Sequence, residues 1–112
     1  MICILEETMK RNAFVMRLKQ GCAKEYKKRH DEIWPELKAE LRKAGISNYS
    51  IYLDEKTNSL FAYQFLADDN TKDELPKLAI MKKWWNMMKD IMDTNPDESP
   101  VSDPLKEMFH MD

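Results

Sequence analysis

The two histidines of this sequence are its best candidates for proton transfer near neutral pH, because imidazole ordinarily titrates in that range. His30 follows Tyr26 by four residues, so the two side chains share one face of a helix. Ile33 and Leu37 lie on the same face and make it apolar. A polar pair on an apolar face must find hydrogen-bond partners or line a cavity. His30 is therefore either a general acid or base in a cavity or a core histidine bonded to the backbone, and the neighbouring tyrosine favours the first interpretation.

A second group of candidates is the tryptophan pair Trp84 and Trp85. Adjacent residues on a helix point about 100° apart, so one ring can face the core while the other lies at its edge. Both could be packing residues, but flat aromatic faces also suit the C–H surfaces of a sugar ring. The sequence has only two glycines and no glycine-rich loop or basic cluster for a phosphate. These residues favour a neutral polyhydroxy ligand.

The charge and the spacing of metal-binding residues exclude several classes of function. The 112 residues carry 18 basic and 20 acidic side chains, a net charge of −2, which gives no basic excess for nucleic acid or anionic lipid. His30 and His110 are eighty residues apart and show no zinc spacing, so the sequence predicts no zinc site. No calcium-loop spacing is visible, and a carboxylate site for magnesium or calcium is the one metal site that stays open. His110 is expected at the surface or at a dimer edge. Cys3 and Cys22 form no C-x-x-C motif, which favours a reduced, cytoplasmic setting. Apolar runs of only a few residues argue against a membrane span.

The first half of the chain alternates strand and helix patterns. Alternating side chains predict a strand from Ala13 to near Gly21. Apolar residues every three or four positions predict a helix over residues 23–44, with a break near residues 31–34 caused by Pro35 and a stop at Gly45. The charged run at residues 24–29 is interpreted as the solvated face of this helix.

The second half predicts a hairpin of strands 48–53 and 60–66, a helical region broken at Pro76, and a clear helix over residues 78–92. The proline-rich residues 95–104 predict an extended segment, and residues 105–111 complete the pattern as a short last strand. The order is β-α-β-β-α-β, which is typical of an α+β, ferredoxin-like sandwich. Because the strands are apolar on both faces, we expect a homodimer of the dimeric α/β-barrel type, in which the second sheet face meets another copy.

Several segments resemble one family, the L-rhamnose mutarotases. Residues 26–37, Tyr-Lys-Lys-Arg-His-Asp-Glu-Ile-Trp-Pro-Glu-Leu, are similar to the family signature Y-x-x-R-H-x-x-I-W-P-E-L. Residues 48–53 resemble its second strand, Trp84-Trp85 its paired tryptophans, and residues 95–100 its proline-rich segment. The resemblance runs from about Met9 to the C-terminus. It divides the chain into an N-terminal extension, residues 1–8, and a single rhamnose mutarotase-like domain, residues 9–112.

The resemblance implies a dimeric, cofactor-free isomerase that exchanges the α and β anomers of L-rhamnose in rhamnose metabolism. It places His30 on the family's proton donor, and Tyr26, Tyr49, Trp84 and Trp85 on its sugar-binding positions. It assigns nothing to His110. The second proton-transfer group stays open between Tyr26, a water and a backbone group, and the preferred sugar stays open between L-rhamnose, L-lyxose and L-mannose.

Two other functions stay open from the sequence. A dimeric haem-binding monooxygenase also uses His, Tyr and Trp on this fold, although only the analogy of fold supports it. A non-catalytic, sugar-binding dimer would bind rhamnose and leave the rate of anomer exchange at its background value.

Overall fold

The computed structural model describes residues 9–112, so the extension predicted at residues 1–8 lies outside the described residues. The elements in chain order are β1 (Met9–Arg17), α2 (Ala23–Asp31), α3 (Pro35–Lys43), β2 (Ile46–Asp54), β3 (Ser59–Ala67), the 3₁₀ helix η1 (Lys72–Lys77), α4 (Ala79–Met88) and β4 (Ser102–Pro104). Because α2 and α3 together replace one long helix, this is the predicted β-α-β-β-α-β order.

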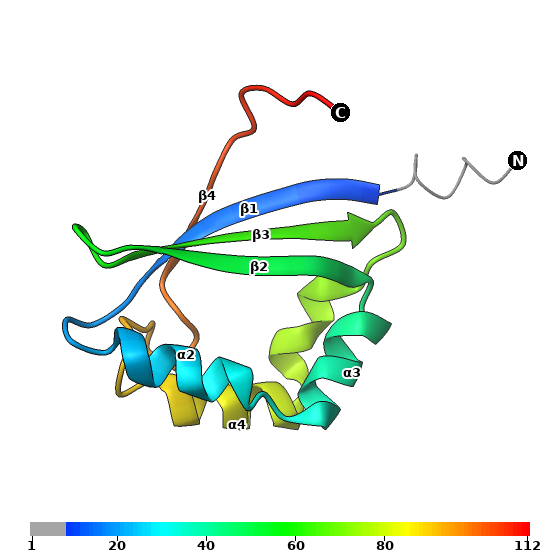
Figure 1. Ribbon diagram of the computed structural model, residues 1–112. Helices are drawn as coiled ribbons and strands as arrows, with labels where there is room; N and C mark the ends of the chain where they lie inside the picture. The colour runs from blue at the N-terminus through cyan, green and yellow to red at the C-terminus, as the bar shows by residue number, and fades with distance from the viewer. Residues whose placement is uncertain (1–8) are drawn as a thin grey trace, which may run out of the picture.

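The strands form a four-stranded antiparallel sheet in the order β2-β3-β1-β4, and the helices lie on one of its faces (Figure 1). Alternation along β1 turns Phe14 and Met16 toward the helices, opposite Ala62 and Leu60 of β3. Leu37 of α3 is 1% exposed and closes this core from the helical side. The layout is the ferredoxin-like α+β sandwich that the sequence predicts.

The break before Pro35 is confirmed. Proline disfavours a helical residue before it, and Trp34 is extended, with ψ of 129°. Pro35 then occupies the first turn of α3, where its missing N–H costs nothing. At the other end, Gly45 has φ of +94° and closes the helix as predicted. His30 therefore lies one residue from the end of α2, beside the gap between the two helices.

Several element boundaries differ from the prediction. Strand β1 begins at Met9 and ends at Arg17, because the chain turns through residues 19–21 rather than continuing as a strand. Strand β2 is longer than residues 48–53 at both ends. Helix α4 ends at Met88, not at residue 92. Ile91 and Met92 lie beyond the end of the helix but are still buried, and Met92 forms a β-bridge with Leu18. The apolar spacing that predicted a longer helix therefore reports burial of these residues and not helical structure.

The predicted last strand at residues 105–111 is wrong. The last strand is β4, inside the proline-rich segment, where it pairs with β1 at the edge of the sheet and tolerates Pro104 there. The following residues are exposed, with Met108 84% and Phe109 80% accessible. His110 is also exposed, 4.0 Å from Asp112, as expected for a surface residue.

The helices leave the other face of the sheet uncovered (Figure 1). Val15 and Tyr52 both pair with Phe61, and Ala13 pairs with Tyr63. Tyr52 is 68% exposed and Phe61 40% exposed. None of the helices within residues 9–112 is long and apolar enough to cross a membrane.

Candidate functional site

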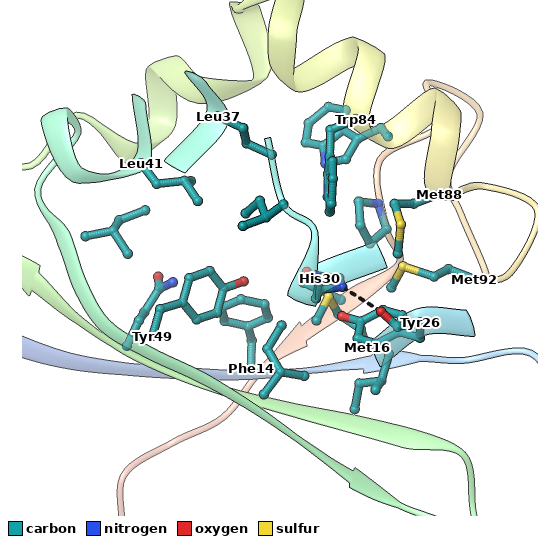
Figure 2. A pocket seen from close by; sticks show the side chains of 18 of the residues that line it. Phe14, Met16, Tyr26, His30, Leu37, Leu41, Tyr49, Trp84, Met88 and Met92 are labelled. Atoms are coloured by element: carbon teal, nitrogen blue, oxygen red, sulfur yellow. Dashed lines mark hydrogen bonds between the residues drawn. The ribbon is translucent and has the colours of Figure 1, made fainter. Parts of the chain in front are cut away.

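A broad cleft of about 1690 Å³ lies between the helices and the sheet. Strand and helix residues both line it, and Figure 2 shows the labelled side chains around it. Its lining includes all of the residues that the sequence nominates, namely Tyr26, His30, Tyr49, Trp84 and Trp85. The structure thus brings the predicted site residues to one place, while their individual roles stay predictions. His110 is not part of this lining.

The imidazole of His30 is enclosed by aromatic rings. Tyr26, one turn earlier on α2, stacks on it with ring centroids 4.2 Å apart and planes 27° apart. Trp84 of α4 meets it edge-on, with centroids 5.4 Å apart. Trp34, in the connection before α3, contacts the same Trp84 ring at 5.2 Å. Rings from three segments therefore fix the orientation of His30.

Hydrogen bonding selects one tautomer of His30. Its Nδ1 lies 3.2 Å from the Tyr26 carbonyl oxygen, and a carbonyl can only accept, so Nδ1 donates the proton. In the neutral ring Nε2 is then an acceptor. Burial lowers the pKa of His30 below its ordinary 6.5, against weaker opposing effects of the Tyr26 carbonyl and Asp31. At neutral pH His30 is a base at Nε2, and it can donate a proton there only after accepting one.

Two tyrosine hydroxyls face the same cleft as neutral groups. Tyr26 is 7% exposed, and burial, with a contribution from Tyr49, raises the pKa of its hydroxyl above the usual range. Although 40% of the Tyr49 surface is exposed, its hydroxyl points into the cleft (Figure 2), and burial there raises the pKa of Tyr49 to about 12. Both phenols keep their protons at neutral pH and can donate hydrogen bonds.

A β-bulge presents Tyr49 to the cleft. The pairing of β2 with β3 shifts by one residue between Ser47 and Ser50, and Asn48 adopts φ of +47° there. Asparagine is one of the few residues that tolerate this left-handed conformation. Bulges re-aim side chains and are over-represented next to active sites. The centroid of the Tyr49 ring lies 6.5 Å from that of Phe14, which walls the cleft beside it.

The paired tryptophans differ in burial as predicted. Trp84 is 7% exposed and belongs to the core, whereas Trp85 is half-buried at the cleft edge. Trp85 therefore offers an accessible ring to a ligand, and Trp84 chiefly supports His30. Met88 and Met92 continue the apolar lining beyond Trp84.

Arg29 anchors α2, the helix that carries His30, to α4. This role of Arg29 was not predicted from the sequence. Its guanidinium donates to the Met87 carbonyl at 2.8 Å and to both carboxylate oxygens of Asp90 at 2.8 and 3.2 Å, which ties α2 to the end of α4. It also donates to Glu25 within α2 at 2.7 Å. Only 18% of its side chain is exposed, so the interpretation of residues 24–29 as solvated is wrong for Arg29.

Asn12 and Gln64 were not predicted as site residues. Their side-chain amides meet across β1 and β3, and both residues line the cleft. The available signal was strand alternation, which places both on the face of Phe14 and Leu60. Among residues 9–112 there is no group of three or more His, Cys, Asp or Glu side chains that could hold a metal ion.

Fold and site together define an α+β protein of the ferredoxin-like class with an aromatic cleft arranged around one imidazole. A family model described as L-rhamnose mutarotase matches residues 11–111. The chain belongs to the L-rhamnose mutarotase family.

Known L-rhamnose mutarotases are similar to this chain over most of its length. An L-rhamnose mutarotase of Bacteroides thetaiotaomicron is 57% identical over 104 residues, which cover 93% of this chain and 100% of that protein. One of Flavobacterium johnsoniae is 54% identical over 102 residues, covering 91% and 95%. The crystal structure of an L-rhamnose mutarotase from Formosa agariphila superimposes with a TM-score of 0.85 at 51% identity, covering 92% of this chain and 99% of that one.

Proposed function

We propose that this protein is an L-rhamnose mutarotase, an isomerase that interconverts the α and β anomers of L-rhamnose in the cytoplasm as part of rhamnose metabolism. Membership of the family supports the activity and the substrate. The observation that carries the mechanism is the position of His30, a neutral imidazole inside an aromatic cleft, whose Nε2 makes no hydrogen bond to any of residues 9–112.

His30 acts on the anomeric hydroxyl. In ring opening, Nε2 accepts the proton of the C1 hydroxyl while the bond between C1 and the ring oxygen breaks and the ring oxygen gains a proton. Rotation about C1–C2 then turns the other face of the aldehyde toward the ring oxygen. On closure the imidazolium returns its proton to the oxygen on C1, and the ring oxygen loses the proton it gained. The balance needs only one base and one acid.

The second group must donate to the ring oxygen. The Tyr26 and Tyr49 hydroxyls and a water in the cleft are the candidates, since both phenols keep their protons at neutral pH. We assign Tyr26, Tyr49, Trp84 and Trp85 to sugar binding, with Trp85 as the accessible ring. Phe14, Met88 and Met92 supply an apolar wall that suits the 6-deoxy methyl group.

The activity is tested by saturation-transfer NMR on free sugars at anomeric equilibrium. We expect the protein to accelerate exchange of L-rhamnose strongly over buffer, with L-mannose and L-lyxose in the same panel to rank the preference. Calorimetric binding of rhamnose with exchange at background would instead identify a non-catalytic sugar-binding protein. A Soret shift on haem titration would support the monooxygenase alternative.

We also propose that the protein is a homodimer through the uncovered sheet face. The exposed aromatic residues Tyr52 and Phe61 support this, because a monomer rarely leaves such a face to water. Sedimentation should give a dimer for the wild type and a folded monomer for Phe61→Asp. A dimer in both would place the interface elsewhere.

Residues 9–112 form the proposed domain, with residues 1–8 as an extension outside it. A chain that starts at Met9 should then keep the exchange activity of the full chain. Loss of activity in a folded protein of this length would mean that the extension contributes to the site. Fractionation of the native host tests the cytoplasmic location.

A further inference from the structure

A polar pair, Asn12 and Gln64, lies on the helix-facing side of the sheet, next to the apolar core. The Asn12 side-chain nitrogen donates to the Gln64 side-chain oxygen at 2.9 Å, across β1 and β3. The next pair on this face is Phe14 with Ala62, and both residues are apolar. Gln64 is only 4% exposed. Burying an amide is costly unless its hydrogen-bonding groups are satisfied, so this pair needs a physical explanation.

The bond between the two amides uses less than half of their hydrogen-bonding capacity. Each amide has an oxygen with two lone pairs and a nitrogen with two hydrogens. Among residues 9–112, no side-chain hydrogen bond other than the one to Asn12 reaches Gln64. No side-chain nitrogen or oxygen of this part of the chain is fully enclosed without a partner. The Gln64 nitrogen and the Asn12 oxygen therefore remain accessible from the cleft that both residues line.

The pair continues a row of polar groups across three strands. Gln64 lies opposite the bulge of β2, because its neighbours Phe65 and Tyr63 pair with Ser47 and Ser50. Two residues of β2, Asn48 and Tyr49, therefore face the single residue Gln64. Directly paired side chains on neighbouring strands lie about 4.5–5.5 Å apart at Cβ. The row runs from Asn12 through Gln64 to Tyr49, whose hydroxyl points into the cleft (Figure 2).

We propose that Asn12 and Gln64 form a hydroxyl-binding subsite on the sheet side of the cleft, and this rests on the proposed function. A free N–H donor beside a free carbonyl acceptor matches two adjacent sugar hydroxyls, one accepting and one donating. Neither group carries a charge, which suits a neutral sugar better than a phosphate or carboxylate. The subsite holds hydroxyls away from the anomeric carbon, so it determines which sugar binds and how the ring is presented to His30.

The test replaces Gln64 by methionine, which keeps the length of the side chain and removes both polar atoms. Gln20→Met is the matched control, since Gln20 is exposed and outside the cleft. Michaelis parameters come from saturation-transfer NMR on L-rhamnose and on analogues that each lack one hydroxyl. We expect KM for L-rhamnose to rise about three- to tenfold in Gln64→Met, with a smaller change in kcat and none in the control. For the analogue that lacks the bound hydroxyl, Gln64→Met should change KM far less than it does for L-rhamnose.

A second variant keeps the proposal testable if Gln64→Met does not fold. Asn12→Val places a β-branched residue at a half-buried strand position, where it is well tolerated, and removes the accessible oxygen. It should also raise KM. Unchanged KM and unchanged discrimination among analogues in a folded variant would overturn the proposal and leave the pair as a cross-strand link only. If the wild type itself fails to accelerate exchange, the proposed function fails, and that result is distinct from an active wild type with unaffected variants.

Discussion

The lowered pKa of His30 predicts the pH profile of anomer exchange. Because burial favours the neutral ring, and Nδ1 holds its proton against the Tyr26 carbonyl, the reactive form has a free Nε2. The enzyme-dependent rate should rise with pH through a midpoint below 6.5 and then stay level. The buried phenols do not end this plateau near neutrality, since burial raises the pKa of Tyr49 to about 12.

The expected change of the exchange rate with pH follows from the direction of the His30 pKa shift. Even at the ordinary pKa of 6.5, about three quarters of His30 would be neutral at pH 7, and a lowered pKa increases that fraction. The rate should therefore rise by less than about 1.3-fold between pH 7 and pH 8. Below the midpoint it should fall about tenfold for each pH unit. Exchange is measured by saturation transfer across this range, with the buffer-catalysed rate subtracted at each pH.

Two results would refute this reasoning. A rate that rises about tenfold from pH 7 to pH 8 would require a base with a pKa well above that of His30. A rate that falls as the pH rises through 6 to 7 would make the imidazolium the reactive form. Stability gives an independent check, because the unfolded chain binds the His30 proton more tightly. The free energy of unfolding should fall as the pH drops below 6.5, and fall less in His30→Gln.

Three further predictions concern the framework of the site. Leu37 is 1% exposed, so Leu37→Ala should lower the free energy of unfolding by about 2–5 kcal/mol in urea titrations. Gly45 has φ of +94° and a Cβ there would lie 3.0 Å from Asn70 Cβ, so Gly45→Ala should destabilise the protein by more than the ~1–2 kcal/mol of backbone strain alone. Gly21 has φ of +79° and no heavy atom within 4 Å of the added Cβ, so Gly21→Ala should lose only the stability that corresponds to backbone strain. Equal losses of unfolding free energy in the two variants would contradict the predicted clash with Asn70. Arg29→Gln should lower the exchange rate and loosen α2, measured by faster amide hydrogen exchange around His30. Lys43→Gln, an exposed position of α3 outside the cleft lining, should change neither.

Local steric rules made part of the architecture predictable. The break at Pro35 and the stop at Gly45 depend only on the residues themselves, so their positions follow from the sequence. The end of α4 does not follow from the sequence in this way. Ile91 and Met92 stay buried after the helix ends, and an apolar pattern cannot distinguish a continued helix from a buried segment that is not helical. The last strand was misplaced because β4 gains its partner from β1, far earlier in the chain.

The sequence predicted the site only where helical spacing places residues on a common face. Tyr26 and His30 are one turn apart, so a shared face followed directly. The role of Arg29 depends on Asp90, 61 residues away, and no local pattern reveals that partner. Asn12 and Gln64 show the alternation that turns them inward, but only the sheet register brings the two amides together and only the bulge sets Tyr49 beside them.

The most direct test of the account compares the exchange rate of L-rhamnose anomers for the wild type and His30→Gln at equal concentrations of folded protein. His110→Gln is the matched control, because His110 lies on the surface outside the cleft. Loss of the base predicts a rate lower by about 100- to 10,000-fold in His30→Gln and an unchanged rate in His110→Gln. Exchange at the wild-type rate in folded His30→Gln would contradict the assignment of His30 as the catalytic base.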